Sequence, residues 1–358
     1  MVETLKDIII AGLGVSGSTL AYALSSKGFK ITAYDPIKKY DKACGEQITG
    51  TENTIGLMKK SDSIITIPNF FSIYVNNKES STIDFGGSSP WYIVNKSRFV
   101  QYLREASISN GVEVIYNNWK GEKGSITVDA RGPFSGSLKN KILVKRYILK
   151  TEWDPNHVIL DFRPNEGGLY WIFPADNDGK LVNMGGGFVN LWNDEILSKS
   201  IMEYAKLNLK DFEIKDVKAA PLDVFSQYKS YSDNVFYVGE AAGLVLAISG
   251  EGNRPAIESS YALSNAIAKY GLEVNDVKNY YLKLSKKIIN DSTLSRKLFM
   301  FTYKYRKSID MVEVLNNIPK WFWYKYLSVN LELNDLIKLG LDLNFISSVI
   351  KGIRYYVK

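Results

Sequence analysis

Cysteine and histidine are almost absent from this chain of 358 residues, which has one of each, Cys44 and His157. A single cysteine excludes an internal disulfide and a cysteine-rich metal site. A single histidine gives little support to zinc chemistry or to a serine–histidine triad. His157 follows an Asp-Pro-Asn turn sequence, so we expect a surface residue there rather than a catalyst. We therefore expect no metal site, and we assign any difficult chemistry to an organic cofactor.

Long apolar runs are absent too. No stretch of about 18 uncharged apolar residues occurs, so we expect no membrane-spanning helix. Lys6 and Asp7 lead directly into the first apolar strand, which is not typical of a secretory signal. The contents of 45% hydrophobic and 23% charged residues are ordinary for a folded protein. We expect a cytoplasmic protein of two domains with an appendage.

The strongest positive signal lies near the N-terminus. An apolar run leads into Gly12-x-Gly14-x-x-Gly17, and a helical pattern follows. In a dinucleotide fingerprint, Gly12 permits the tight turn, Gly14 lets the backbone approach a pyrophosphate, and Gly17 lets helix and strand pack closely. The helix N-terminus, with Ser16, supplies free N–H groups to the phosphates.

A second apolar strand, residues 29–34, completes this βαβ unit and ends in Asp35, 23 residues after Gly12. Asp35 is placed to accept a hydrogen bond from an adenosine ribose hydroxyl. The alternative is a structural βαβ unit without a ligand. The full context of strand, glycines, helix, strand and acid favours dinucleotide binding.

A second glycine-rich region distinguishes between cofactors. A strand at 235–238 ends at Gly239-Glu240, and Gly250-Glu251-Gly252 then opens another helix at Asn253. A carboxylate after the strand can bind a polyol such as ribityl, and a helix N-terminus can stabilise negative charge on a reduced ring. An NAD dehydrogenase needs no such return segment, so we expect FAD. The alternative is a loop that joins a strand to a core helix.

Seven motifs together resemble the geranylgeranyl reductase family. They are the GxGxxG run, Asp35-Pro36, Cys44-Gly45-Glu46, Asp129-Ala130-Arg131-Gly132-Pro133, Trp171-Ile172-Phe173-Pro174, Gly239-Glu240-Ala241-Ala242-Gly243 and Gly250-Glu251-Gly252. Members are FAD enzymes with the p-hydroxybenzoate hydroxylase type of fold. The resemblance runs from about residue 7 to about residue 270 and rests most specifically on the cysteine–glycine pair and the later WIFP.

The chain departs from the family pattern at two of these motifs. Family members usually have Asp where Glu240 stands, and Tyr where Leu169 stands, two residues before Trp171. The longer side chain of Glu240 could still reach a ribityl group. These departures concern the identity of the substrate more than the identity of the cofactor.

The resemblance also implies roles for individual residues. It adds Cys44, Gly45 and Gly132 to the cofactor contacts, and it places Cys44 close to the flavin and the substrate, where the thiol gates, positions or protonates the reacting alkene. The alternative for Cys44 is a small buried residue of the loop. Trp171, Phe173 and Pro174 are expected to form the wall of an apolar substrate cavity or, alternatively, ordinary sheet core.

The order of the motifs predicts an α/β fold with a discontinuous Rossmann-type FAD-binding domain. That domain comprises residues 1–62, 95–135 and 232–275, with a buried helix face in residues 96–110. Residues 63–94 and 136–231 are expected to form an antiparallel β-sheet substrate domain, and residues 276–358 a C-terminal helical region. The predicted strands of the sheet are residues 63–67, 72–75, 143–150, 158–162, 169–173 and 181–188.

The C-terminal region has helical periodicity at residues 276–289 and 334–356 and mixes aromatic and basic residues at 299–326. One interpretation is a basic amphipathic surface that contacts the inner face of a membrane. The other is a helical subdomain with its aromatic residues in the core, which the sequence alone favours. A net charge of +7 also permits nucleic-acid binding, but no motif supports it, so we expect none.

The resemblance implies an FAD-dependent reductase that saturates C=C bonds in geranylgeranyl chains of archaeal-type membrane lipids or related prenyl compounds. No second GxGxxG follows a strand, so the external electron donor is expected to be NAD(P)H bound transiently or a reduced redox protein. The alternative is an FAD-dependent monooxygenase or other oxidoreductase acting on an aromatic or quinone substrate. A third class is a flavin protein that transfers electrons or binds ligands without turnover.

Overall fold

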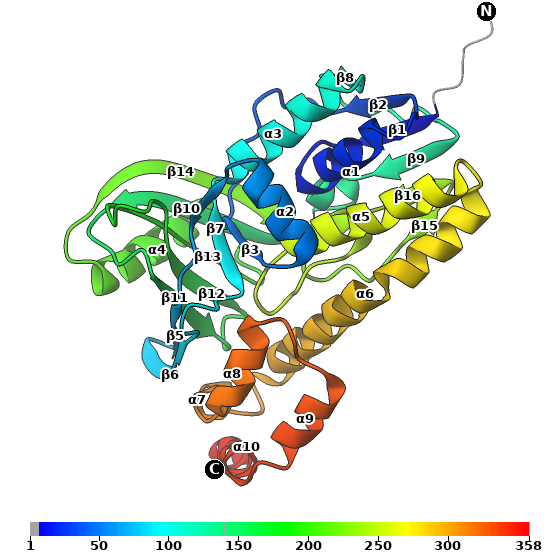
Figure 1. Cartoon of the computed structure of the whole chain (residues 1–358). Coiled ribbons are helices and arrows are strands. Elements are labelled where there is room, and N and C mark those ends of the chain that lie inside the picture. The colour runs from blue at the N-terminus through cyan, green and yellow to red at the C-terminus, as the bar shows by residue number, and fades with distance from the viewer. Residues whose placement is uncertain (1–6, 139–140, 358) are drawn as a thin grey trace, which may run out of the picture.

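Two large β-sheets and a set of C-terminal helices make up the molecule, and a computed structural model describes residues 7–138 and 141–357 (Figure 1). Residues 1–6, 139–140 and 358, which belong to the predicted domains, lie outside the described residues. The predicted α/β architecture with a helical C-terminal region is confirmed. The division into domains stays a prediction.

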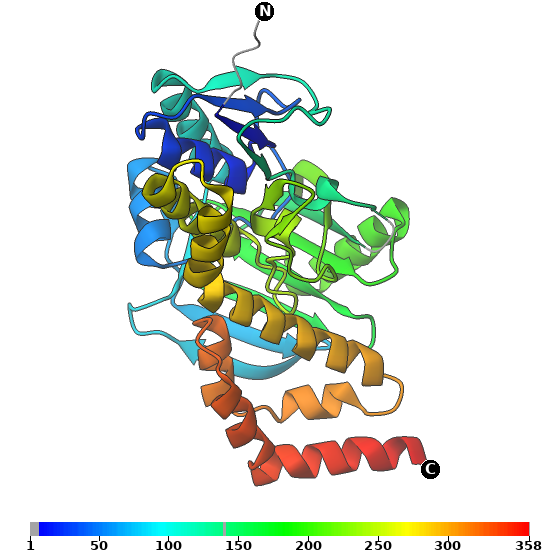
Figure 2. The same ribbon diagram turned by 90° about the vertical axis from the view of Figure 1, so that its right-hand side faces the viewer.

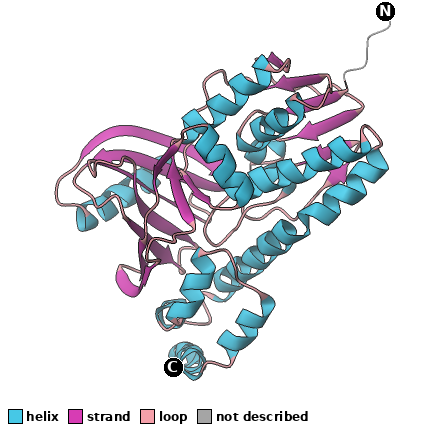
Figure 3. Cartoon of the chain, viewed as in Figure 1, coloured by secondary structure: helices cyan, strands magenta, loops and turns pink. Residues whose placement is uncertain are grey.

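A six-stranded sheet carries the N-terminal βαβ unit. In spatial order its strands are β15 (Tyr231–Ser232), β16 (Val235–Tyr237), β9 (Ile126–Asp129), β1 (Ile8–Ala11), β2 (Ile31–Tyr34) and β8 (Glu113–Ile115). All pairings are parallel except that of β15 with β16. β1 and β2 are buried along their whole length, as expected for strands covered by helices. Beside it, helix α1 (Val15–Ser25) packs against both α3 (Lys96–Ser109) and α5 (Asn253–Tyr270) (Figure 3).

A seven-stranded sheet forms the second layer. In spatial order its strands are β14 (Glu213–Leu222), β10 (Ile142–Lys150), β13 (Leu181–Phe188), β12 (Gly168–Pro174), β11 (His157–Arg163), β5 (Phe70–Val75) and β6 (Lys78–Asp84). Alternate residues face opposite sides, so that Tyr170 and Ile172 pack with helix α4 (Asp194–Asn208), whereas Trp171 and Phe173 face the other way. One feature differs from prediction, because β5 pairs with β11 in parallel rather than antiparallel orientation.

The predicted strand at 63–67 lies outside that sheet. It is β4 (Ile64–Thr66), which joins β7 (Trp91–Val94) and β3 (Gln47–Thr49) in a separate three-stranded sheet. Helix α2 (Glu52–Lys60) connects β3 to β4. The prediction was wrong on this point because alternating apolar and polar residues indicate a strand but do not specify its partner strand.

The C-terminal helices run away from the six-stranded sheet and end at the far side of the molecule (Figure 2). They are α6 (Val274–Tyr305), α7 (Met311–Asn316), α8 (Lys320–Leu327), α9 (Leu333–Gly340) and α10 (Leu343–Val357). Residues 276–289 are therefore part of a longer helix than predicted, and residues 334–356 form two helices rather than one. Within the described parts of the chain, no helix has both the length and the apolar character needed to cross a membrane.

Candidate active site

One cavity with a volume of about 870 Å³ runs between the two large sheets and the C-terminal helices. Its size lies at the upper end of the range typical of small-molecule sites, about 300–1,000 Å³. It begins at the N-terminal βαβ unit, passes Cys44 and β12, and continues to α9 and α10. The cavity therefore has one end at the βαβ unit and a second, apolar part, the apolar limb, that reaches the C-terminal helices.

The first end of the cavity is built by the N-terminus of α1. Gly14 is the N-cap residue and no side chain caps the helix, so backbone N–H groups remain available for an anion. An added Cβ at Gly14 would meet nothing closer than Tyr40 Cε2 at 3.7 Å, so this position opens into the cavity. By contrast, a Cβ at Gly17 would lie 1.8 Å from Gly12 O. Gly17 thus packs helix against strand and does not line the cavity.

Asp35 lies at the end of β2, where the fingerprint predicts it, and it lines the cavity. Its Oδ2 accepts hydrogen bonds from Leu13 N at 2.6 Å and from Arg104 Nη2 at 3.1 Å. Its Oδ1 accepts one from Ile37 N at 2.8 Å, which leaves acceptor capacity on that oxygen. Arg104 also donates to the carbonyls of Leu13 and Ile37. Arg104 therefore holds together the loop after β1 and the loop after β2.

The segment after β16 returns to the same cavity. The 3₁₀ turn η2 (Gly239–Ala242) presents Glu240, whose Oε1 accepts a hydrogen bond from Asp223 N at 2.8 Å. Glu240 Oε2 pairs with Lys42 Nζ at 3.2 Å. Gly132, at positive φ, faces the same carboxylate, and a Cβ there would lie 3.4 Å from Glu240 Oε2. Gly239 is packed against Ser16 and, unlike Glu240 and Gly132, does not line the cavity.

The N-terminus of α5 forms the next part of the wall. Gly252 is its N-cap without a capping side chain, and Gly250 has a φ of 70°. The neighbouring Glu251 carboxylate accepts hydrogen bonds from Thr49 N and Thr49 Oγ1. Burial raises the pKa of Glu251, although Arg254 and the bonds from Thr49 oppose this rise. The helix end is thus an anion-favouring surface with a carboxyl group beside it.

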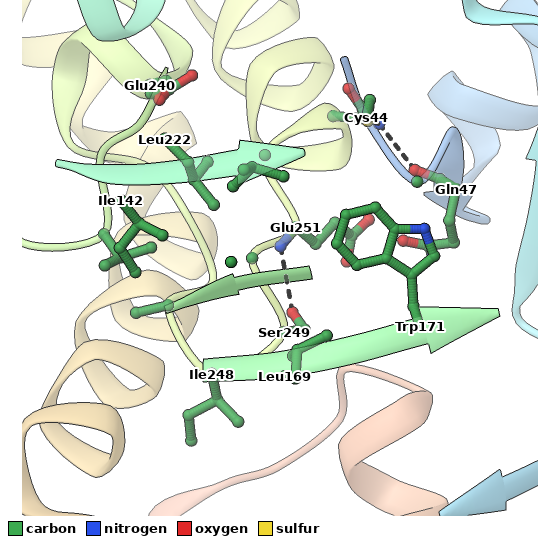
Figure 4. A pocket seen from close by; sticks show the side chains of 18 of the residues that line it. Cys44, Gln47, Ile142, Leu169, Trp171, Leu222, Glu240, Ile248, Ser249 and Glu251 are labelled. Carbon is green, nitrogen blue, oxygen red and sulfur yellow. Dashed lines mark hydrogen bonds between the residues drawn. The ribbon is translucent and has the colours of Figure 1, made fainter. Parts of the chain in front are cut away.

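The loop that carries Cys44 is fixed by β12 and β13. Asn183 donates through Nδ2 to Cys44 O at 2.9 Å and accepts from Trp171 Nε1 at 3.0 Å. Gly45 is required here, because a Cβ would lie 2.8 Å from Phe173 Cε2. The cysteine–glycine pair and the WIFP strand, distant in sequence, therefore lie against each other (Figure 4).

Cys44 is half-buried and lines the cavity among polar groups. Its Sγ accepts hydrogen bonds from Glu46 N at 3.3 Å and Asn253 Nδ2 at 3.6 Å. Burial works to raise the pKa of Cys44, but the nearby Lys96 ammonium and these hydrogen bonds outweigh it, so the pKa lies below its ordinary value. Burial acts to lower the pKa of Lys96, but Cys44, Tyr40 and Glu46 raise it on balance. The result is a buried ammonium beside a thiol whose pKa is lowered.

The other limb of the cavity is apolar. β10, β11 and β12 contribute their inward-facing side chains on one side, and the C-terminal helices close the other. The aliphatic and aromatic lining residues of this limb include Ile142, Val144, Leu160, Phe162, Leu169, Phe299, Phe322, Trp323, Leu336, Leu339 and Phe345. β13 places Gly187 in this wall, and a Cβ on neighbouring Gly185 would clash with Trp171 at 2.3 Å. Glycines in this strand therefore leave space for the cavity and the indole.

Most of the predicted site residues meet in this one cavity. Those that line it are Gly12, Gly14, Ser16, Asp35, Cys44, Gly45, Gly132, Trp171, Phe173, Glu240, Gly250, Gly252 and Asn253. Gly17, Gly239 and Pro174 do not line it, and Pro174 ends β12 instead of contacting the space predicted for substrate. His157 is half-buried at the start of β11 and lies outside the lining. Across the described residues, no cluster of potential metal ligands occurs.

Sequence reasoning missed two charged residues, Lys96 and Arg104. Both are almost fully buried and both lie on α3. They share the helix face of Phe99, Val100 and Leu103, so a charged residue on an apolar stripe was the available signal. The C-terminal aromatics divide between the two predicted interpretations, since Phe299, Phe322 and Trp323 are buried whereas Phe301 and Tyr324 are exposed.

No family model matches the chain. It is 23% identical over 313 residues to the digeranylgeranylglycerophospholipid reductase of Methanococcus vannielii, covering 75% of this chain and 78% of that protein. Among solved structures, it is similar to a geranylgeranyl bacteriochlorophyll reductase-like protein from Thermoplasma acidophilum, with a TM-score of 0.68 and 18% identity over 98% of this chain and 97% of the other.

A flavin-dependent brominase is similar in fold too, with a TM-score of 0.68 and 15% identity over 98% of this chain and 99% of that one. The structural likenesses show the fold shared by these flavin-dependent enzymes. Together with the sequence relatives, they confirm the resemblance to the geranylgeranyl reductases that the motifs predicted. We conclude that the chain is an oxidoreductase similar to the geranylgeranyl reductases.

Proposed function

We propose that this chain, a relative of the geranylgeranyl reductases, uses FAD to saturate C=C bonds in geranylgeranyl chains of archaeal-type membrane lipids or related prenyl compounds. The single observation that carries the proposal is the continuity of the cavity. It joins two uncapped helix N-termini to a limb lined by aliphatic and aromatic side chains, with Cys44 between them. A dinucleotide needs the first feature and a flexible isoprenoid chain needs the second.

The residues present fit FAD. Gly14 and Ser16 at the start of α1 would hold the pyrophosphate, and Asp35 the adenosine ribose. Glu240 with Gly132 would face the ribityl chain. The N-terminus of α5 at Gly252 would face the pyrimidine edge of the ring. An added Cβ at Gly14 or Gly252 would meet nothing closer than 3.7 Å, which supports this assignment because both backbones can be approached closely.

The side chains around Cys44 would hold the alkene in register. Bound reduced FAD supplies a hydride for one alkene carbon, and the other carbon needs a proton. An isolated alkene has no carbonyl to polarise it, so positioning and exclusion of water must provide much of the catalysis. Trp171 and Phe173 form a rigid apolar wall for the chain. Cys44 Sγ is the nearest candidate proton carrier, and Lys96 Nζ would return a proton to it.

The sequence contains no motif that identifies the electron donor. No further GxGxxG follows a strand, so we propose that NAD(P)H binds transiently or that a reduced redox protein delivers the electrons.

Anaerobic incubation tests the function directly. The FAD-loaded, dithionite-reduced enzyme is mixed with geranylgeranyl lipid, and the products are analysed by mass spectrometry. A gain of two hydrogen atoms per double bond supports reduction. With oxygen present, gain of an oxygen atom would favour the aromatic or quinone monooxygenase alternative. Unchanged lipid in both cases would overturn the proposed function. Dithionite with lipid but without enzyme is the control.

A further inference from the structure

Helices α9 and α10 expose large apolar side chains to solvent. On α9 and just after it, Leu333 is 68% exposed, Ile337 56% and Leu341 73%, and these residues recur every fourth position along one face. Leu343, at the start of α10, is 81% exposed. Ile350 and Ile353, further along α10, are also exposed, at 45% and 43%. We call these six residues the α9–α10 patch.

The opposite side of the same helices is also apolar. Leu336 and Leu339 on α9, and Phe345 on α10, line the apolar limb of the cavity. Helix α9 therefore presents apolar residues both inward and outward. An exposed apolar face of this size is normally covered by a partner or by a lipid phase. Within the described structure, the outer side of α9 has no such cover.

Charges of both signs border the patch, Glu332 and Asp342 as well as two lysines, but the C-terminal segment that carries it is positive on balance. Lys338 on α9 and Lys351 on α10 are exposed next to it, and Lys338 lies 4.5 Å from the ring centroid of Trp321. Residues 301–358 contain nine lysines and arginines against five aspartates and glutamates, so they carry more than half of the chain's net charge of +7. Lysines at the border of an apolar face can keep their ammonium groups among anionic headgroups while their stems lie along the apolar surface.

The position of the patch suits a planar partner. α10 runs along the outer edge of the molecule, on the side away from the six-stranded sheet (Figure 2). α9 and α10 have 8 and 15 residues, and no described helix is able to span a bilayer. Short helices with one apolar face and flanking lysines are typical of segments that lie in the membrane interface.

We propose that the α9–α10 patch inserts into the surface of a bilayer that contains anionic lipids, and that this places the apolar limb of the cavity directly above the lipid phase. The partner is the membrane itself rather than a protein. The role in substrate delivery rests on the proposed function, because a membrane lipid with a geranylgeranyl chain would pass from the bilayer into the limb behind Leu336 and Leu339. The docking itself requires only the exposed side chains and the charge.

Vesicle flotation tests the docking. The full-length, FAD-loaded protein is mixed with vesicles of phosphatidylcholine containing 30% phosphatidylglycerol (about the anionic content that gives a substantial surface potential) and with pure phosphatidylcholine vesicles. The wild type is expected to float with the anionic vesicles, and less so as salt is raised. The double variant Leu341→Gln/Leu343→Gln should bind at least about tenfold more weakly. Neither residue lines the cavity, and both are exposed enough for the variant to fold.

The matched control is Leu207→Gln on α4. Leu207 is 73% exposed, as Leu341 is, but belongs to a helix that packs on the seven-stranded sheet. This variant should float like the wild type. Failure of the wild type to float, or equal flotation of the double variant and the wild type, would overturn the proposal. So would a dimer in light scattering that the double variant abolishes, because the patch would then be an interface between copies.

Turnover of detergent-dispersed geranylgeranyl lipid separates this inference from the proposed function. If the wild type and the double variant both reduce dispersed lipid but the wild type does not float, docking fails while the function holds. If the wild type floats and the double variant does not, but neither reduces the alkene, the function fails while docking holds.

Discussion

Lys96 places its buried ammonium group beside the Cys44 sulfur, and each residue shifts the pKa of the other toward the charged pair. Lys96 is 3% exposed and its Nζ also lies 5.7 Å from the ring centroid of Tyr40. A buried cation next to a low-pKa thiol is costly unless the two compensate each other. Under the proposed function, this pair is the candidate route by which a proton returns to Cys44.

Lys96→Met should raise the pKa of Cys44. Removing an opposite charge at this range shifts a pKa by about 1 to 3 units, and burial would then dominate. Because Cys44 is the only cysteine, the pH profile of alkylation by iodoacetamide reports it directly. The profile should move to higher pH. Lys59→Met, at the exposed end of α2, is the control and should leave it unchanged. An unshifted profile in Lys96→Met would remove Lys96 from the site.

Gly14→Val should fold but lose FAD. Its Cβ would point into open cavity space, so the side chain fills the approach to the pyrophosphate without disturbing the core. Gly17→Val is the contrasting variant, because its Cβ would clash with Gly12 O and should lower stability. Flavin absorbance and thermal melting distinguish the two. A yellow Gly14→Val protein would contradict the assignment of α1 to the cofactor.

Arg104→Met should destabilise the fold by about 3 to 5 kcal/mol, because it leaves Asp35 buried without its cation. The control lies on the same helix. Arg98 pairs with Asp62, but its side chain is 57% exposed, so Arg98→Met should cost no more than about 1 kcal/mol. Urea unfolding measures both. Equal losses would mean that Arg104 contributes only packing.

The local motifs of the sequence were sufficient to predict the βαβ unit, because Gly12, Gly14 and Asp35 act within one short stretch. The motifs also implied that Cys44 and Trp171 share a site, which the structure supports through Asn183 and Gly45. No local motif indicated which distant strands pair with each other. The parallel contact of β5 with β11 and the separate sheet of β4 depend on the global path of the chain.

The C-terminal part was less predictable for a related reason. Its helices are apolar on the sides that line the cavity and also on exposed sides, so periodicity alone could not define which face is buried. Helix α8 supplies Trp323 to the cavity wall although its aromatic–basic composition is equally typical of a membrane surface.

Glu251→Gln should change the pH dependence of stability. The folded pKa of Glu251 is raised above 4.5, so the folded state binds the extra proton. The stabilisation that Glu251 gives the folded state is complete below the pKa of the unfolded state and is lost as the pH rises through the pKa of the folded state. Relative to the wild type, the variant should lose less free energy of unfolding as the pH rises above 4.5 toward neutrality. Parallel pH profiles for the two proteins would show that the carboxyl is not perturbed by burial.

Cys44→Ser should retain FAD and the fold but lower alkene reduction. The change removes a low-pKa proton carrier while preserving a small side chain that can accept from Glu46 N and Asn253 Nδ2. We expect a loss of about 10²-fold or more in turnover, the lower range for general acid catalysis. Product analysis and flavin absorbance are measured together. Wild-type turnover with unchanged products would reduce Cys44 to a loop residue.

Leu336→Trp should shorten the isoprenoid chain that the enzyme accepts. Leu336 lines the apolar limb on α9, far from the βαβ unit, and it is only half-buried, so a larger ring can enter the cavity without overpacking the core. Lipids with geranylgeranyl chains should lose at least about tenfold in kcat/KM, a cost of about 1.4 kcal/mol, whereas geranyl analogues should not. With detergent-dispersed substrates, which need no membrane docking, Ile337→Trp on the exposed face of the same helix should leave both substrates unaffected. Only a substrate long enough to reach α9 should be affected by the larger side chain at position 336. If Leu336→Trp slows the reduction of geranylgeranyl and geranyl substrates equally, the apolar limb does not hold the distal part of the isoprenoid chain.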